Sequence, residues 1–315
     1  MMKKDLSTIT VIGQGVMGPD IALAFAMGGY EVIGVDILRE PLERAARKIA
    51  SNCRQLIEGG MMSEEESEAV QARISLTLEW ETSAQKADYV MEAVPEDMKV
   101  KKEVFTHCGD LCSREVVVAS NTSSMSISEI ASAMNYPERA ITTHWTIPAH
   151  LSPMVEVAMG RRTSQDTYEM VMRFLKGLGK IPIRCQDTPG FVHNYIQFAM
   201  VRAALDLVES GSISPSDIDA IVRNGFGLRV SSVGPLQFVD LCGLDTFLNI
   251  QRYMYDKTGN PVYLPSKTIE QKVSRGELGL KSGKGFYDHE GEKVPNLWEQ
   301  TNSTIISLLK SVMRT

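Results

Sequence analysis

The sequence contains few cysteines and no long hydrophobic run. Five cysteines are scattered over 315 residues, and no two of them form a Cys-x-x-Cys motif. This pattern argues against a disulfide framework and against a metal site, and it is typical of a reducing, cytoplasmic environment. No apolar run approaches the roughly 20 residues of a membrane-spanning helix, and no apolar segment precedes the β-rich run that begins at Thr8. We therefore expect neither a membrane protein nor a secretory signal.

Positive charge is also in deficit. Lysine and arginine together number 33, against 39 aspartate and glutamate residues, so the net charge is −6. This balance argues against a nucleic-acid-binding surface. Hydrophobic residues make up 43% of the chain, as in ordinary globular proteins, and 315 residues exceed what a single core usually holds. Two domains are therefore expected.

A glycine-rich motif follows the first β-rich run and opens a helical pattern. Its sequence is Gly13-Gln14-Gly15-Val16-Met17-Gly18. The first glycine permits a tight turn, the second lets the backbone approach a pyrophosphate, and the third lets the helix pack closely on the strand. The helix N-terminus then faces the phosphate charge. We expect a dinucleotide to be bound by Gly13, Gly15, Val16, Met17 and Gly18.

Asp36 indicates which dinucleotide is bound. It ends the next apolar run, about 20 residues after the motif, where a carboxylate accepts hydrogen bonds from the ribose 2′-hydroxyl. The same carboxylate repels a 2′-phosphate. The expected cofactor is therefore NAD rather than NADP.

The chain changes character near Asp187. Before it, short apolar runs alternate with patterns of helical period, which predicts an α/β domain with a mostly parallel sheet over residues 1–186. After it, helical periods dominate and predict an all-α domain over residues 187–315. The predicted strands are 8–12, 31–36, 74–78, 88–94, 116–120, 140–144, 154–157 and 181–184. The predicted helices of the first domain are 15–27, 40–57, 63–72, 99–108, 126–134 and 165–178, and Ser126 with Glu129 forms a capping-box pattern.

Polar side chains at strand ends are candidates for chemistry. The cluster Ser120–Ser124 directly follows one predicted strand, and His144 ends another. Glu156 lies inside an otherwise apolar strand, where a carboxylate is costly unless it is paired. His144 is a natural partner, because a carboxylate fixes the imidazole tautomer that a general base needs. The residues alone leave open a structural histidine and an edge-strand glutamate. Asn194, at the domain junction, is a third candidate.

These motifs together resemble the 3-hydroxyacyl-CoA dehydrogenase family, and the resemblance covers nearly the whole chain. It includes the glycine motif, His144 with Glu156, and the stretches 92–96, 120–124, 187–191, 234–236, 243–245 and 279–287.

The resemblance implies an NAD-dependent oxidoreductase of fatty acid metabolism, with a Rossmann-like domain and a helical domain that forms a homodimer. It implies that His144 removes the substrate hydroxyl proton, that Glu156 orients His144, and that Ser123 and Asn194 bind the reacting oxygen. It also implies cofactor contacts on the nicotinamide side from Glu96 and Lys101, with Asn121 in the same crevice.

Departures from the family pattern concern the substrate. Ile147 stands where an asparagine is usual, Tyr195 stands where an arginine is usual, and residues 48–78 are acidic rather than lysine-rich. A coenzyme A phosphate prefers positive charge. The alternative is a small free hydroxy acid or aldehyde carboxylate, with Trp145 and His150 shaping its pocket. A non-catalytic NAD-binding protein is a third interpretation.

Overall fold

The computed structural model describes residues 6–289 and 294–312, which form two compact units that divide between Met200 and Val201. The first unit contains one sheet of eight strands in the order β3-β2-β1-β4-β5-β6-β7-β8. The strands are β1 Thr8–Ile12, β2 Glu31–Val35, β3 Ile74–Thr77, β4 Tyr89–Glu92, β5 Val117–Ser120, β6 Ala140–Trp145, β7 Met154–Met159 and β8 Ile181–Gln186. All eight predicted strands are confirmed.

The sheet is mostly parallel, as predicted. Neighbouring strands from β3 through β6 run parallel, β7 is antiparallel to β6, and β8 is parallel to β7. The strand order reverses between β1 and β4. In sheets of this kind a crevice for ligands opens at the carboxyl ends of the strands at the reversal.

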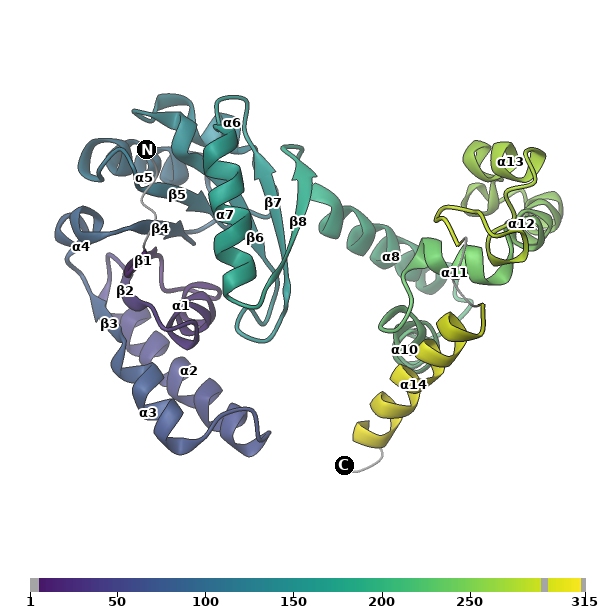
Figure 1. The fold of residues 1–315 in the computed structure, drawn as a ribbon, viewed down its shortest axis with the longest axis horizontal. Coiled ribbons are helices and arrows are strands. Elements are labelled where there is room, and N and C mark those ends of the chain that lie inside the picture. The colour runs from purple at the N-terminus through teal and green to yellow at the C-terminus, as the bar shows by residue number, and fades with distance from the viewer. Residues whose placement is uncertain (1–5, 290–293, 313–315) are drawn as a thin grey trace. The chain divides into compact units, whose positions relative to one another are not determined.

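Helices cover both faces of the sheet (Figure 1). They are α1 Gly18–Met27, α2 Arg39–Glu58, α3 Glu64–Ala72, α4 Trp80–Lys86, α5 Met98–Leu111, α6 Ile127–Ile130 and α7 Gln165–Gly177, with 3₁₀ turns at Ala131–Ala133 and Pro137–Arg139. One apolar core joins the sheet to α1, α2, α3 and α7, and the other joins it to α4, α5 and α6. Alternate strand residues enter opposite cores: Tyr89 and Met91 enter the first, and Val90 enters the second.

Two local predictions differ from the structure. Helix α4 was not predicted, because its buried residues are only Ser83 and Ala84, which leave no apolar period to recognise. The capping box at Ser126 is wrong. The Ser126 hydroxyl donates to Asp187 at 2.6 Å, and the same carboxylate accepts the amides of Ile127 and Ser128. Asp187 therefore caps α6 from a position far along the chain.

The second unit is built of helices, which confirms the predicted all-α character. Helix α8, Phe191–Glu209, runs from the first unit into the second. It is followed by α9 Pro215–Ile221, a π-helical turn at Val222–Gly227, α10 Leu228–Val230, α11 Pro235–Cys242, α12 Leu244–Thr258, α13 Lys267–Ser274 and α14 Val294–Val312, with 3₁₀ turns at Pro261–Tyr263 and Leu280–Ser282. Within the described ranges, no helix has both the length and the apolarity needed to cross a membrane. The division at residues 186 and 187 stays a prediction.

Candidate active site

The glycine-rich turn lies between β1 and α1, where the strand order reverses. Gly13 has φ +92°, and a Cβ there would lie 2.6 Å from the carbonyl oxygen of Ala93. A Cβ on Gly18 would lie 2.0 Å from the carbonyl oxygen of Gly13. Only glycine fits these two positions. By contrast, the space beside Gly15 is open, and Val16 is 69% exposed.

The turn has the donors that a dinucleotide phosphate needs. Among the described residues, none accepts a hydrogen bond from the amides of Gly15 and Val16, in the turn that precedes α1. Asp36, just after β2, accepts the amide of Gln14 at 2.8 Å and the amide of Leu38 at 3.2 Å. These bonds hold the carboxylate next to the turn. The residues present therefore fit a dinucleotide.

His144 and Glu156 form a buried hydrogen-bonded pair. The antiparallel register of β6 and β7 sets them opposite each other, and His144 Nδ1 lies 2.8 Å from Glu156 Oε2. A carboxylate can only accept, so in the neutral imidazole Nδ1 carries the proton and Nε2 has a free lone pair. In the described part of the chain, Nε2 has no hydrogen-bond partner. This arrangement can take a proton from a ligand at Nε2 and can stabilise the resulting imidazolium.

Glu156 also joins the pair to the start of α8. Its Oε1 accepts the amide of Val192 at 2.9 Å and the amide of His193 at 2.8 Å. The next residue, Asn194, donates from Nδ2 to the carbonyl oxygen of Ser123 at 2.9 Å. The structure thus links all four predicted catalytic residues through hydrogen bonds and one turn of helix.

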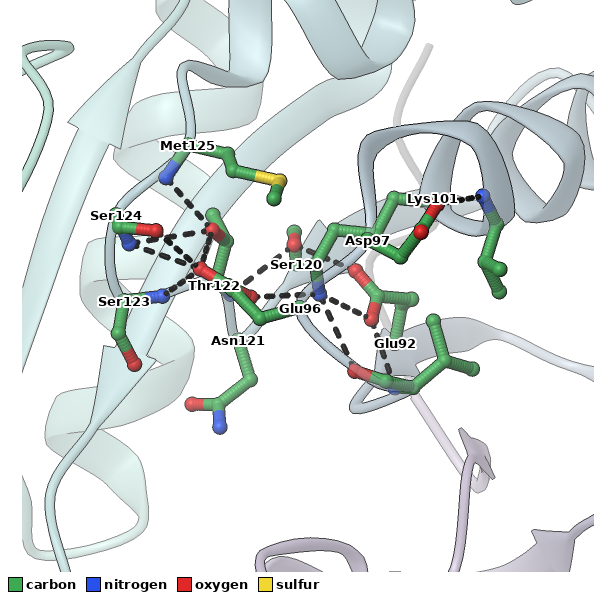
Figure 2. Close-up of polar contacts among 12 residues, drawn as sticks. Glu92, Glu96, Asp97, Lys101, Ser120, Asn121, Thr122, Ser123, Ser124 and Met125 are labelled. Carbon is green, nitrogen blue, oxygen red and sulfur yellow. Dashed lines mark hydrogen bonds and ion pairs between the residues drawn. The ribbon is translucent and has the colours of Figure 1, made fainter.

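Glu96 anchors the loop that carries Ser123 (Figure 2). Its Oε1 accepts the Thr122 hydroxyl at 2.6 Å and the amides of Ser123 and Ser124 at 2.9 Å each. Burial alone raises the pKa of Glu96, but the hydrogen bonds from Thr122 and Ser124 and the charge of Lys101 outweigh it and lower the pKa. Glu96 is therefore ionised, and it holds the backbone of Ser123 in place.

Lys101 lies between two carboxylates. It is only 1% exposed, and its Nζ lies 2.8 Å from Glu92 Oε1 and 3.2 Å from Glu96 Oε2 (Figure 2). Ser120 donates its hydroxyl to Glu92 Oε2 at 2.6 Å. Burial raises the pKa of Glu92, and the nearby Lys101 charge opposes that rise. Lys101 thus contacts protein groups and fixes the carboxylate of Glu96.

Asn121, Trp145 and His150 lie in different environments. Asn121 Oδ1 accepts the amide of Trp145 at 2.9 Å, which fixes the end of β6 beside His144. The Trp145 ring is buried in the core, 5.3 Å from the ring of Phe25, on the face opposite His144. His150 Nδ1 lies 3.8 Å from Asp20 Oδ1. The structure does not bring the Trp145 and His150 side chains to the His144–Glu156 pair.

The sequence interpretation missed several residues around the pair. The rings of Phe191 and His193 lie 5.7 Å and 6.1 Å from that of His144. Phe191 has φ +47°, a left-handed conformation that is strained for a bulky residue and often marks a functional site. Glu92 was missed as well, although it is a carboxylate within an apolar strand. The sequence signal that could have found Glu92 is the one that pointed to Glu156, a carboxylate inside an apolar strand.

Among the described residues, no cluster of three or more metal-ligating side chains occurs.

Comparison with known sequences and structures gives consistent matches over most of the chain. Residues 8–188 match the family described as 3-hydroxyacyl-CoA dehydrogenase, NAD binding domain, and residues 190–289 match the family described as 3-hydroxyacyl-CoA dehydrogenase, C-terminal domain.

Relatives and a solved structure match over most of their own lengths. The 5-formyl-3-hydroxy-2-methylpyridine 4-carboxylate 5-dehydrogenase of Mesorhizobium japonicum is 30% identical over 304 residues, which are 96% of this chain and 97% of the relative. The probable 3-hydroxybutyryl-CoA dehydrogenase of Bacillus subtilis is 35% identical over 286 residues, 91% of this chain and 98% of the relative. The 3-hydroxyacyl-CoA dehydrogenase structure from Archaeoglobus fulgidus superposes with a TM-score of 0.79 at 30% identity, covering 97% of this chain and 99% of that one.

Proposed function

The chain belongs to the 3-hydroxyacyl-CoA dehydrogenase family of NAD-dependent enzymes, and on this premise we propose that it interconverts a 3-hydroxyacyl-CoA and the 3-ketoacyl-CoA. The observation that carries the proposal is the buried His144–Glu156 pair, in which Nδ1 is 2.8 Å from the carboxylate and Nε2 is free. A hydroxyl group oxidised by hydride loss needs such a base.

The residues divide the chemistry among them. NAD supplies the hydride acceptor. His144 takes the hydroxyl proton at Nε2 during oxidation and returns it during reduction, and Glu156 stabilises the cation formed. Ser123 and Asn194, which the hydrogen bond between them holds together, orient the reacting oxygen. General base catalysis of this kind contributes about 10²- to 10⁴-fold in rate.

The cofactor is assigned to the crevice at the carboxyl ends of β1 and β4. The backbone from Gly13 to Gly18, including Val16 and Met17, takes the pyrophosphate, and Asp36 takes the adenosine ribose. On the nicotinamide side we assign Glu96 and Asn121, with Lys101 acting through Glu96. The indirect role of Lys101 is supported by its burial between Glu92 and Glu96.

A small free hydroxy acid or aldehyde carboxylate is the second candidate substrate. Ile147, in the loop after β6, is 69% exposed and offers no amide group to a ligand. The Mesorhizobium japonicum relative, which covers 96% of this chain, is named for a pyridine carboxylate. Both observations favour a pocket that is not built around coenzyme A.

NADH oxidation followed by absorbance separates the two candidates. The matched substrates are acetoacetyl-CoA and free acetoacetate, which share the reacting keto group, followed by a panel of aldehyde and keto carboxylates. Turnover of acetoacetyl-CoA at least about 100-fold faster than of acetoacetate supports the thioester substrate, since this ratio corresponds to about 2.7 kcal/mol of binding to the carrier. Turnover of a free carboxylate alone supports the second candidate. Tight NADH binding with no turnover of any substrate indicates a non-catalytic protein.

A homodimer through the helical part of the chain is also proposed. Helix α8 presents large apolar side chains to solvent, among them Tyr195 at 77% and Phe198 at 66% exposure. Such side chains are usually covered by a partner surface. Sedimentation of the wild-type chain and of Phe198→Glu tests this, because loss of the dimer in the variant is expected.

The five free thiols support a reducing, cytoplasmic location.

A further inference from the structure

A buried carboxylate lies directly behind the glycine-rich turn. Asp20 is in the first turn of α1 and is 2% exposed. The N-terminus of this helix is where the cofactor phosphates are expected, because its amides and its dipole attract anions. A negative side chain here opposes the binding of the phosphates. Something in the protein must therefore offset its charge.

Lys48 of α2 is the cation that contacts Asp20. Its Nζ lies 3.0 Å from Asp20 Oδ1 and also donates to the carbonyl oxygen of Val16 at 2.7 Å. Asn52, one turn further along α2, donates to the same Asp20 oxygen at 2.8 Å. Lys48 thus touches both the buried charge and the backbone of the turn.

His150 does not replace Lys48 in this role. Its Nδ1 is 3.8 Å from Asp20 Oδ1, and no described residue forms a hydrogen bond with that nitrogen. Burial is the main cause that lowers the pKa of His150, and the charges of Lys48 and Lys180 act in the same direction, while Asp20 opposes them. His150 is therefore neutral near pH 7, and the positive charge beside Asp20 comes from Lys48.

We propose that Lys48 is a positioning residue for the cofactor, which neutralises Asp20 and holds the Val16 carbonyl so that the amides of Gly15 and Val16 face the phosphates. Asp20 fixes the Lys48 ammonium in return. The two residues act as one unit, so the effect of replacing either residue on cofactor affinity depends on whether the other is present. The proposal depends on NAD binding and is independent of which substrate the enzyme uses.

Titration of NADH fluorescence gives the dissociation constant without any turnover. Lys48→Met leaves the Asp20 charge unopposed near the phosphates, so the dissociation constant is expected to rise roughly 10- to 100-fold. Asp20→Asn removes the charge that opposes the phosphates and keeps an oxygen for Asn52, so it is expected to bind NADH at least as tightly as the wild type. The double variant Asp20→Asn/Lys48→Met is expected to recover to within about fivefold of the wild type, because no uncompensated charge remains.

Arg47→Met is the matched control. Arg47 is the neighbouring residue on α2 and is exposed. Arg47→Met removes the same charge as Lys48→Met, but NADH affinity is expected to stay unchanged. Thermal unfolding without cofactor checks that each variant folds. If Lys48→Met fails to fold, the recovery of the double variant still tests the proposal. A double variant that binds NADH more than about tenfold more weakly than the wild type overturns it. A Lys48→Met variant with normal NADH affinity and a raised KM for acetoacetyl-CoA also overturns the proposal, because that result places Lys48 in substrate binding.

Discussion

Replacing Glu156 by glutamine removes one charge from the His144–Glu156 pair and changes little else. The glutamine oxygen can keep the two backbone amides of Val192 and His193, which now bond to Glu156 Oε1. The amide nitrogen then faces His144 Nδ1 and donates to it. His144 is forced into the tautomer with a proton on Nε2, which can no longer accept the proton of a substrate hydroxyl.

The size of the effect follows from the geometry. With Nδ1 and Oε2 2.8 Å apart, the two charge centres are about 4 Å apart, and at an effective dielectric constant of about 20 their interaction is about 4 kcal/mol. That corresponds to about 10³-fold in rate. The comparable change beside the histidine of serine proteases, which also reverses the tautomer, lowers kcat by about 10⁴. We expect kcat for Glu156→Gln to fall by about 10³ to 10⁴.

Steady-state NADH oxidation and NADH fluorescence titration measure the two sides of this prediction. The dissociation constant for NADH is expected to stay within about twofold of the wild-type value, because Glu156 is outside the glycine-rich turn. Glu115→Gln, an exposed carboxylate elsewhere in the same unit, serves as the control and should behave like the wild type. A Glu156→Gln variant that retains more than about a tenth of wild-type kcat refutes the reasoning.

Three further predictions concern the cofactor side of the site. Asp36→Ala is expected to weaken NADH binding and to relax the preference over NADPH; an unchanged ratio of the two dissociation constants removes Asp36 from the ribose site. Lys101→Met frees Glu96 and the Ser123 loop, so kcat should fall by about 10-fold or more, whereas Lys102→Met, at a surface ion pair on the same helix, should leave it unchanged. The pKa of Glu96 is lowered from 4.5, so the stability that its charge contributes is present above pH 4.5 and is lost as the pH falls. Urea unfolding across this range should show a weaker acid dependence for Glu96→Gln.

The sheet was predictable because its information is local. Each strand is a short apolar run between turn residues, and a run such as Val117–Ser120 is buried along its whole length. The cap of α6 was not predictable in the same way. Ser126 has the sequence neighbours of a capping box, but Asp187, whose place near α6 only the tertiary fold determines, takes the bonds instead.

The candidate site was predictable where burial makes a residue costly. A carboxylate in an apolar strand needs a partner, and this reasoning indicated Glu156 and leads equally to Glu92. Side-chain direction limits the rest. Successive residues of a strand face opposite sides, so Trp145 must point away from the face that His144 occupies. Proximity in sequence to His144 therefore did not indicate a contact with the substrate.

The most direct test of the account compares turnover and NADH binding in His144→Ala. Rates of NADH oxidation are measured with the best substrate of the panel, and NADH affinity is measured by fluorescence on the same preparation. The account predicts that turnover falls by several orders of magnitude while the dissociation constant for NADH stays near the wild-type value. Near-normal turnover in His144→Ala contradicts the central claim, because another group then removes the proton.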